Sequence, residues 1–244
     1  MASQKWLVTG SNRGIGLEFV KQLSQRKNIT IFATARNPEK ATELNALAAA
    51  NPNVHIFKLE STSVAEAAAV AKGIDQIDGE GLDVVVANAA IANNWQKVTE
   101  IDLGSLAEHH RVNVGGTVIL FKAVYPLLLK RQTRKFVAIS TLAASMTNFF
   151  EAATGSVYGS SKAALNYVLK SIAAELGPEG FIAFPLNPGL VDTEMGRGAS
   201  DTFGWGEIAL KAHESVAGML KVIDNATKEQ NGHFLSYDET EIPW

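Results

Sequence analysis

The chain of 244 residues is 46% hydrophobic and 19% charged, a composition typical of globular proteins and far from that of disordered ones. Its net charge of -3 and isoelectric point near 6.0 provide no general attraction to nucleic acid or to an anionic membrane. The absence of cysteine excludes disulfides, thiolate catalysis and cysteine-ligated metal. The length fits one large α/β domain, residues 1–244, with a sizeable core.

The N-terminal residues MASQKWLVTG lack the basic and then apolar profile of a signal peptide. No uninterrupted apolar run approaches the roughly 18 residues of a membrane-spanning helix. The histidines show no spacing typical of metal ligands. We therefore expect a soluble, cytoplasmic protein with a small-molecule site, and no metal, nucleic-acid or membrane partner.

The first thirty residues predict a strand, a glycine turn and a helix. An apolar run at residues 6–9 ends at Gly10, and an amphipathic stretch begins around Gly14 and Gly16. Such a turn lets the backbone approach a pyrophosphate at the N-terminus of the helix, where free N–H groups and the helix dipole favour anions. Three glycines can also form a merely tight turn, but their place at the start of an α/β chain favours nucleotide binding.

The second predicted strand, residues 29–34, indicates which nucleotide is bound. It ends at Ala35 and Arg36, where an NAD-selective site carries an acidic residue for the ribose hydroxyls. Ala35 leaves room for a 2′-phosphate, and Arg36 with Arg13 offers two guanidinium groups to pair with it. Arginines are more often solvated surface charges, but both lie at the expected adenosine end. The sequence therefore predicts NADP(H).

The remaining pattern predicts a Rossmann-type fold. Five more strands are expected, at residues 54–59, 82–87, 135–139, 181–186 and 233–236. The alternation with helices indicates a doubly wound, mainly parallel seven-stranded sheet with helices on both faces. A capping box from Ser63 to Glu66 is expected to start one helix, and residues 105–131 predict a long helix around Asn113. The irregular segment 194–205 is the candidate for a mobile lid.

Tyr158 and Lys162 are four residues apart in a predicted helix, within VYGSSKAA, so that both side chains lie on one face. A phenol has a pKa of about 10, and a nearby ammonium group favours the phenolate and lowers that pKa. Such pairs also occur by chance on helices. The other motifs make this one a candidate catalytic pair.

Together the motifs resemble those of a short-chain dehydrogenase/reductase over essentially the whole chain. They are TGSNRGIG at residues 9–16, Asn88-Ala89, Asn113, Ser140-Thr141, Tyr158 with Lys162, and Asn187-Pro188-Gly189 through Thr193. Two C-terminal stretches, residues 232–237 and 242–244, are similar to the carbonyl-reductase branch that includes Sniffer, bacterial C-factor and fungal polyketide ketoreductases. The resemblance implies NADPH-dependent reduction of a ketone or aldehyde, with an apolar substrate expected.

The same resemblance implies individual roles. Tyr158 would donate the proton, Lys162 would lower its pKa and hold the nicotinamide ribose, and Asn113 would keep a water in a proton relay. Strand register assigns the substrate-binding hydroxyl to Ser140 or Thr141, whereas counting thirteen residues back from Tyr158 gives Ser145. The implied cofactor contacts are Gly10, Asn12, Arg13, Gly14, Ile15, Gly16, Arg36, Glu60, Ser61, Asn88, Tyr158, Lys162, Pro188, Gly189, Val191 and Thr193.

Two alternatives remain at the level of function. The same residues fit an NADP-dependent secondary-alcohol dehydrogenase working in the oxidative direction, or a non-catalytic NADP(H)-binding sensor, although a sensor has no use for an activated phenol. Six apolar residues fit either of two interpretations, the lining of a substrate pocket or ordinary core packing. They are Met146, Phe149, Phe150, Met195, Phe203 and Trp205.

A homodimer or homotetramer is expected from the resemblance, through the helices of Asn113 and Tyr158. Both helices carry apolar residues on more than one face. The candidate interface residues are Val118, Leu120, Phe121, Val124, Ala163, Leu165, Val168 and Leu169.

Overall fold

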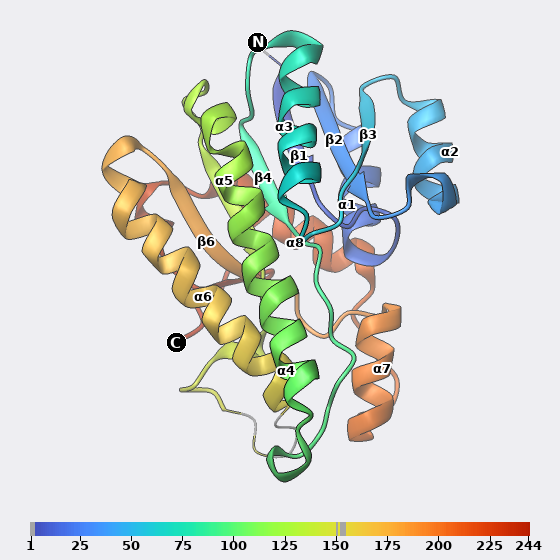
Figure 1. The fold of residues 1–244 in the computed structure, drawn as a ribbon, viewed down its shortest axis with the longest axis vertical. Helices are drawn as coiled ribbons and strands as arrows, with labels where there is room; N and C mark the ends of the chain where they lie inside the picture. Colours follow the sequence, from blue (N-terminus) through green and yellow to red (C-terminus); the bar gives the residue numbers. More distant parts are fainter. Residues whose placement is uncertain (1–2, 150, 152–154) are drawn as a thin grey trace.

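The computed structural model describes residues 3–149, 151 and 155–244, and it has three layers, with a sheet between two sets of helices (Figure 1). All six strand pairings in the seven-stranded sheet are parallel, and the strand order is β3-β2-β1-β4-β5-β6-β7. The order reverses direction between β1 and β4, as in a doubly wound fold. The predicted fold class is therefore confirmed. The strands are β1 (Gln4–Val8), β2 (Ile29–Ala35), β3 (Val54–Lys58), β4 (Val84–Ala87), β5 (Lys135–Ile139), β6 (Ile182–Asn187) and β7 (Leu235–Ser236).

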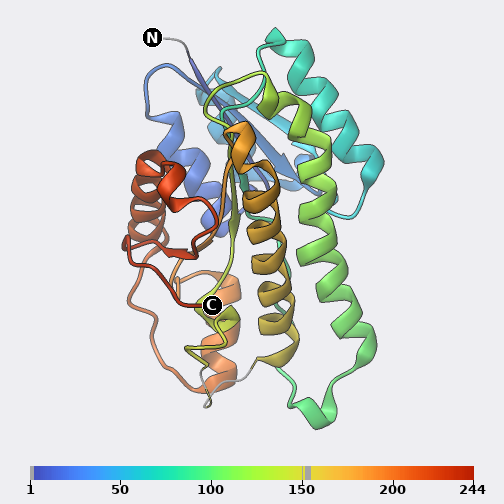
Figure 2. The same cartoon turned by 90° about the vertical axis from the view of Figure 1, so that its left-hand side faces the viewer.

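The central strands are apolar throughout because both of their faces are covered. Alternate side chains of β1 enter different cores: Trp6 and Val8 join the core beneath α1 and α8, whereas Leu7 joins the core beneath α3, α5 and α6. Figure 2 shows these two helical layers on either side of the sheet. The helices are α1 (Gly14–Ser24), α2 (Thr42–Ala50), α3 (Val64–Asp78), α4 (Leu103–His109), α5 (Gly116–Leu129), α6 (Ser156–Leu176), α7 (Glu194–Phe203) and α8 (Ala212–Asn225).

The long helix expected around Asn113 is present, but its middle is a π-helical turn, His110–Gly115, between α4 and α5. Such turns are rare and often lie at functional sites. The expected capping box is only half formed. Ser63 Oγ accepts a hydrogen bond from Glu66 N, but the Glu66 carboxylate accepts one from Glu60 N instead of Ser63 N.

Residues 194–205, expected to be irregular, form the regular helix α7 over most of their length, so this prediction is wrong. Thr193 caps the helix by accepting a hydrogen bond from Gly196 N at 3.1 Å. A Cβ at Gly196 would lie 2.1 Å from the carbonyl oxygen of Val191. The small residues that suggested an irregular segment therefore allow the helix to pack closely against the chain that follows β6.

Among the described residues, one helix is long and apolar enough to cross a membrane by length and composition alone, Leu103–Leu129. Its most apolar window has a mean hydropathy of 1.6, and 44% of that window is buried. Asn113, Thr117 and Lys122 interrupt its apolar residues, which is why the sequence shows no uninterrupted apolar run there. A single such helix is a weak indication, because core helices pass the same test, and here α5 packs on the sheet beside α3.

Half of the apolar residues proposed for a subunit interface belong instead to the core. Leu120, Val124, Leu165 and Leu169 are buried between the sheet and the helices α5 and α6. They face inward because apolar positions three and four residues apart form the stripe with which a helix packs on a sheet. The other four, Val118, Phe121, Ala163 and Val168, stay partly exposed.

Candidate active site

The glycine turn between β1 and α1 has the conformation that its sequence predicts. Gly10 and Gly14 have φ values of +66° and +56°, which side chains other than glycine rarely adopt. Gly16 is required for a different reason. A Cβ at this position would lie 2.3 Å from the carbonyl oxygen of Gly10 and 2.5 Å from Asn88 Nδ2. The first turn of α1 therefore packs directly on the strand end that precedes it.

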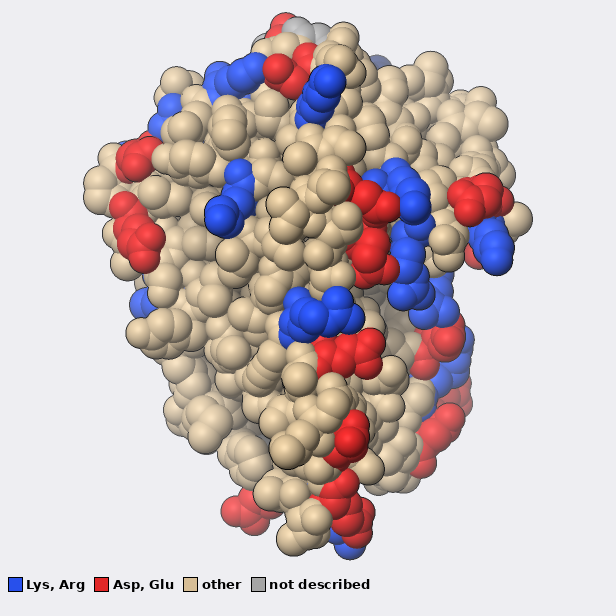
Figure 3. Space-filling model, viewed as in Figure 1, with Lys and Arg blue, Asp and Glu red and all other residues tan. Residues whose placement is uncertain are grey.

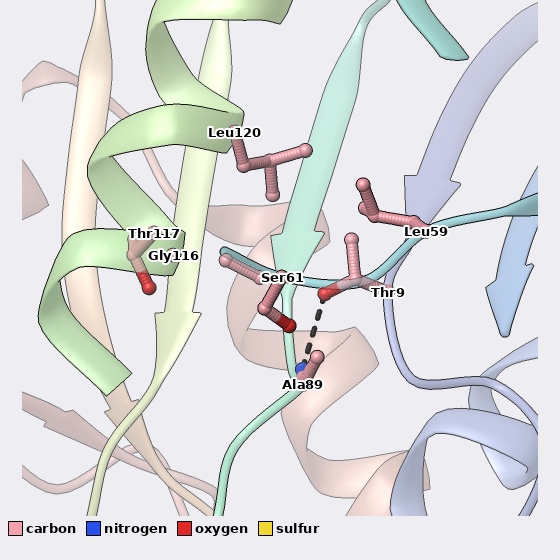
Figure 4. A pocket seen from close by; sticks show the side chains of 8 residues that line it. Thr9, Leu59, Ser61, Ala89, Gly116, Thr117 and Leu120 are labelled. Atoms are coloured by element: carbon pink, nitrogen blue, oxygen red, sulfur yellow. Dashed lines mark hydrogen bonds between the residues drawn. The ribbon is translucent and has the colours of Figure 1, made fainter. Parts of the chain in front are cut away.

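Asn88, at the end of β4, holds this turn in place. Its Nδ2 donates to the carbonyl oxygens of Thr9 at 2.9 Å and Gly10 at 3.3 Å. The backbone N–H groups of Asn88 and Ala89 both donate to Thr9 Oγ1, and Figure 4 shows the hydrogen bond from Ala89. Ser61 lies nearby and lines a narrow pocket with Thr9, Ala89 and residues of α5. Asn88 is thus a positioning residue for the turn.

The N-terminus of α1 fits the phosphates of a dinucleotide. Its first turn contains no acidic residue, and its N-cap residue, Arg13, gives it no side-chain cap, so its N–H groups and dipole are available to an anion. Asn12 is exposed at the turn, and Ile15 packs partly on the core. This uncapped helix N-terminus lies where the sequence predicts a phosphate-binding turn.

Both arginines expected at the adenosine end are exposed, Arg13 at 67% and Arg36 at 72%. Each lies beside a carboxylate: Arg13 forms an ion pair with Glu194 at the start of α7, and Arg36 lies 3.9 Å from Glu60. Exposed ion pairs of this kind contribute little to stability. Both guanidinium groups can therefore turn toward a phosphate at small cost.

The chain after β6 lies against the glycine turn. The carbonyl oxygen of Pro188 accepts a hydrogen bond from Ser215 Oγ at 2.6 Å, which anchors the loop to α8. Gly189 has a φ of +79°, and Val191 is buried. Thr193 approaches the glycine turn, with its Cγ2 3.6 Å from the position of a Cβ on Gly14. These contacts place the loop opposite the predicted cofactor residues of α1.

Tyr158 and Lys162 lie side by side on α6. The Lys162 Nζ is 5.8 Å from the centre of the Tyr158 ring. It donates a hydrogen bond of 2.7 Å to the carbonyl oxygen of Ile139, the last residue of β5. Only 3% of Lys162 is exposed. The pair is thus fixed at the carboxyl ends of the strands, where ligands bind in this fold.

Burial, and not a neighbouring charge, dominates the acid–base properties of the pair in the protein alone. It raises the pKa of the Tyr158 phenol and lowers the pKa of the Lys162 ammonium group to about 7. This direction for Tyr158 is opposite to the expected one. The reason is that desolvation of the phenol itself penalises the charged phenolate form. The arrangement favours a neutral phenol, which is the form that donates a proton.

The low pKa of Lys162 predicts a pH-dependent stability. Between pH 7 and 10.5 the unfolded lysine binds a proton that the folded one has lost, so the free energy of unfolding rises with pH by up to about 1.4 kcal/mol per unit. Urea denaturation across this pH range is expected to show that the free energy of unfolding rises more steeply with pH for wild type than for Lys162→Met. Parallel profiles for the two proteins would contradict the shift.

Three hydroxyl groups were candidates for binding the substrate oxygen, and the structure separates them. Ser140 and Ser145 are each 1% exposed. Ser140 Oγ donates to Asn166 Oδ1 at 2.6 Å, and Ser145 Oγ donates to the carbonyl oxygen of Pro243 at 2.5 Å. Thr141 is partly exposed at the end of β5. Its Oγ1 accepts a hydrogen bond from Ala143 N, and the described residues give its proton no acceptor.

Asn113 lies in the π-helical turn and is 1% exposed. Its Oδ1 accepts from Ile91 N, and its Nδ2 donates to Ile91 O and Ser161 Oγ, all at 2.9 to 3.0 Å. Ser161 Oγ in turn donates to the carbonyl oxygen of Tyr158. Asn113 thus connects the segment after β4 to the helix of the candidate catalytic pair.

An aromatic cluster lies beside Tyr158, and sequence reasoning proposed Phe203 and Trp205 for the pocket but missed Trp95. Trp95, in the segment after β4, lies edge-on to the Tyr158 ring with the centroids 5.7 Å apart, and it contacts Phe203 of α7 in the same way at 5.6 Å. Trp205 stacks on Phe203 at 5.0 Å. Nothing in the local sequence around Trp95 indicates this position. Phe150, also proposed for the pocket, lies outside the described residues.

Comparison with known proteins agrees with the fold. Residues 4–203 match the family model described as short chain dehydrogenase. The chain therefore belongs to the short-chain dehydrogenase/reductase family, and it is an oxidoreductase of the carbonyl-reductase branch. Within the described residues, no three His, Asp or Glu side chains gather in a way that could hold a metal ion.

The relatives include two fungal oxidoreductases. An uncharacterised oxidoreductase of Schizosaccharomyces pombe is 40% identical, with 98% of this chain and 97% of the relative covered. The norsolorinic acid ketoreductase of Aspergillus parasiticus is 36% identical, with 98% and 90% covered.

Two solved structures overlay the whole chain. An NADPH-bound carbonyl reductase from chicken fatty liver has a TM-score of 0.91 at 31% identity. The carbonyl reductase Sniffer of Drosophila melanogaster has a TM-score of 0.90 at 28% identity. Each covers 100% of both chains.

Proposed function

We propose that this chain reduces a ketone or aldehyde to the alcohol, with NADPH as the source of hydride. The observation that carries the proposal is the Tyr158 and Lys162 pair, held at the carboxyl ends of the strands by the carbonyl oxygen of Ile139. NADPH, when bound, supplies a hydride to the carbonyl carbon. The carbonyl oxygen must then gain a proton, and Tyr158 is the side chain that donates it.

The geometry supports a role for each neighbouring group. A phenol is protonated at neutral pH even at its ordinary pKa of about 10, and burial raises that pKa further, so Tyr158 is present in the form that a general acid needs. Lys162, with a pKa of about 7, can supply a proton to the Tyr158 phenolate after Tyr158 has donated its own. The hydroxyl proton of Thr141 can stabilise the developing negative charge on the substrate oxygen. Asn113 orients α6 through Ser161.

The test of this proposal is NADPH oxidation, followed by absorbance, with a panel of ketones and aldehydes. The relatives named as carbonyl reductases and as a ketoreductase support this direction of the reaction. The same site would also catalyse alcohol oxidation with NADP⁺, and measuring both directions distinguishes the two. NADPH binding without any turnover would favour a non-catalytic sensor.

We propose NADP(H) rather than NAD(H) because Arg13 and Arg36 flank the predicted adenosine end, and no acidic residue follows β2 directly. Arg36→Asp is expected to weaken NADPH binding by at least about tenfold, the loss of one charge-assisted hydrogen bond of about 1.5 to 3 kcal/mol. NADH binding is expected to change far less, since NADH has no 2′-phosphate.

Isothermal titration with each cofactor measures both affinities. Lys228→Asp makes the same charge change at an exposed position after α8 and serves as the control. Equal losses for NADPH and NADH in Arg36→Asp would show that Arg36 does not bind the 2′-phosphate.

We further propose that the protein is a cytoplasmic homodimer or homotetramer, with no nucleic-acid or membrane partner. Partly exposed apolar side chains on the neighbouring helices α5 and α6, among them Val118, Phe121 and Val168, support a subunit contact there. Acidic and basic side chains alternate on the face shown in Figure 3, and this argues against nucleic acid at that face. A monomer in sedimentation at micromolar concentration would contradict the assembly.

A further inference from the structure

The aromatic cluster beside Tyr158 consists of Trp95, Phe203 and Trp205, and the reaction chemistry does not require it. Trp95 comes from the segment after β4, and the other two come from the end of α7 and the residues just after it. Figure 1 shows α7 at the same end of the molecule as the carboxyl ends of the strands. Two segments distant in sequence thus bring indole and phenyl rings together over one site.

The position of these rings makes them neighbours of any substrate. A carbonyl oxygen must come within about 2.6 to 3.2 Å of the Tyr158 hydroxyl to receive its proton. Trp95 lies edge-on to the same ring at 5.7 Å, so the groups attached to the carbonyl carbon lie within its reach. Trp95 and Phe203 are partly exposed, which leaves aromatic surface of these two rings available for contact.

The geometry among these rings suits aromatic partners. The planes of Trp95 and Phe203 meet at 75°, and those of Phe203 and Trp205 at 26°, so the cluster offers both ring edges and a stacked face. Aromatic rings attract one another in edge-to-face and offset-stacked arrangements beyond the effect of buried area. A saturated ring of the same size lacks the quadrupole that this attraction needs.

We infer that Trp95 and Phe203 determine specificity, and that the substrates are planar aromatic ketones or aldehydes whose ring packs on the surface formed by Trp95 and Phe203. This inference rests on the proposed reductase function and narrows its substrate class. The reaction balances as one hydride from NADPH to the carbonyl carbon and one proton, from Tyr158, to the oxygen. The products are the aryl alcohol and NADP⁺.

The test compares acetophenone with cyclohexyl methyl ketone, which has the same carbon skeleton but a saturated ring. The two ketones differ in intrinsic reactivity, so the informative quantity is the change in the ratio of their kcat/KM values between protein variants. Trp95→Leu is expected to lower the aryl-to-cyclohexyl ratio by about tenfold, the order of one or two aromatic ring contacts. The kcat/KM for the cyclohexyl ketone is expected to stay within about threefold of wild type.

Three further variants make the result specific to the rings. Phe203→Leu is also expected to lower the aryl-to-cyclohexyl ratio of kcat/KM values. Trp95→Phe keeps an aromatic ring, and its ratio is expected to stay close to that of wild type. Tyr167→Leu removes an aromatic ring from the exposed side of α6 and is expected to leave the ratio unchanged. NADPH affinity, measured for every variant, verifies that each one is folded.

The possible outcomes distinguish a failure of this inference from a failure of the proposed reductase function. If wild type reduces both ketones and Trp95→Leu and Phe203→Leu leave the ratio unchanged, the aromatic surface does not select substrates and the inference is wrong. If wild type reduces no ketone or aldehyde while binding NADPH, the reductase proposal itself fails. A loss of activity on both ketones together in Trp95→Leu, with Trp95→Phe restoring neither, would assign Trp95 a structural role and overturn the inference.

Discussion

Replacing Tyr158 by phenylalanine is expected to lower kcat for carbonyl reduction by about 10² to 10⁴, the usual contribution of a general acid. The ring and its contact with Trp95 are retained, so only the proton donor is lost. Because the hydroxyl contributes nothing to the phosphate-binding turn of α1, NADPH affinity is expected to remain close to that of wild type. Steady-state kinetics with an accepted ketone and a fluorescence titration with NADPH measure the two quantities.

Tyr167→Phe is the matched control for this substitution. It makes the same chemical change nine residues further along the same helix, at a side chain that is 77% exposed, and we expect it to leave kcat unchanged. Full activity of Tyr158→Phe would show that the proton comes from another group, and the assignment of Tyr158 would be withdrawn.

The second large effect is expected from Gly16→Ala. The new Cβ would lie 2.3 Å from a backbone oxygen of Gly10 and 2.5 Å from Asn88 Nδ2, and a backbone group cannot move aside as the end of a long side chain can. Overpacking of this kind costs about 1 to 3 kcal/mol of stability. The glycine turn must shift, and losing one charge-assisted hydrogen bond to a phosphate lowers NADPH affinity by about tenfold or more.

Gly198→Ala provides the control, because it makes the same change in helix α7 at a position where a Cβ meets nothing within 4 Å. Alanine has the higher helix propensity, by about 0.8 to 1 kcal/mol, so this variant is expected to be slightly more stable than wild type. Thermal unfolding and NADPH titration of both variants test the contrast. Unchanged affinity and stability in Gly16→Ala would contradict the close packing of the turn.

The sequence was most informative where the signal is local. The valine run of β4 is apolar because both of its faces are covered, and this could be read without any knowledge of the neighbouring strands. Gly10 and Gly14 indicated a turn because their positive φ values favour glycine. The spacing of Tyr158 and Lys162 placed both on one face of a helix.

Prediction failed where the outcome depended on contacts between distant segments. The segment of α7 looked irregular because its glycines and small polar residues are poor helix formers, yet packing against Val191 and the Thr193 cap hold it helical. Likewise, Leu120 and Leu165 looked available for a subunit interface, but they fill the core between the sheet and its helices. Amphipathic patterns alone do not say which apolar face meets which partner.

The glycine turn and the side-by-side placement of Tyr158 and Lys162 could be predicted from spacing within short segments. The doubly wound sheet could be predicted from the alternation of strands and helices along the chain. Which hydroxyl keeps its proton available depends on long-range contacts, since Ser140 and Ser145 donate to Asn166 and Pro243, residues far along the chain. The tertiary structure also decided the direction of both pKa shifts and the contact of Trp95 with Phe203. Burial and contact depend on which distant segments fold together, and this information is not local to any motif.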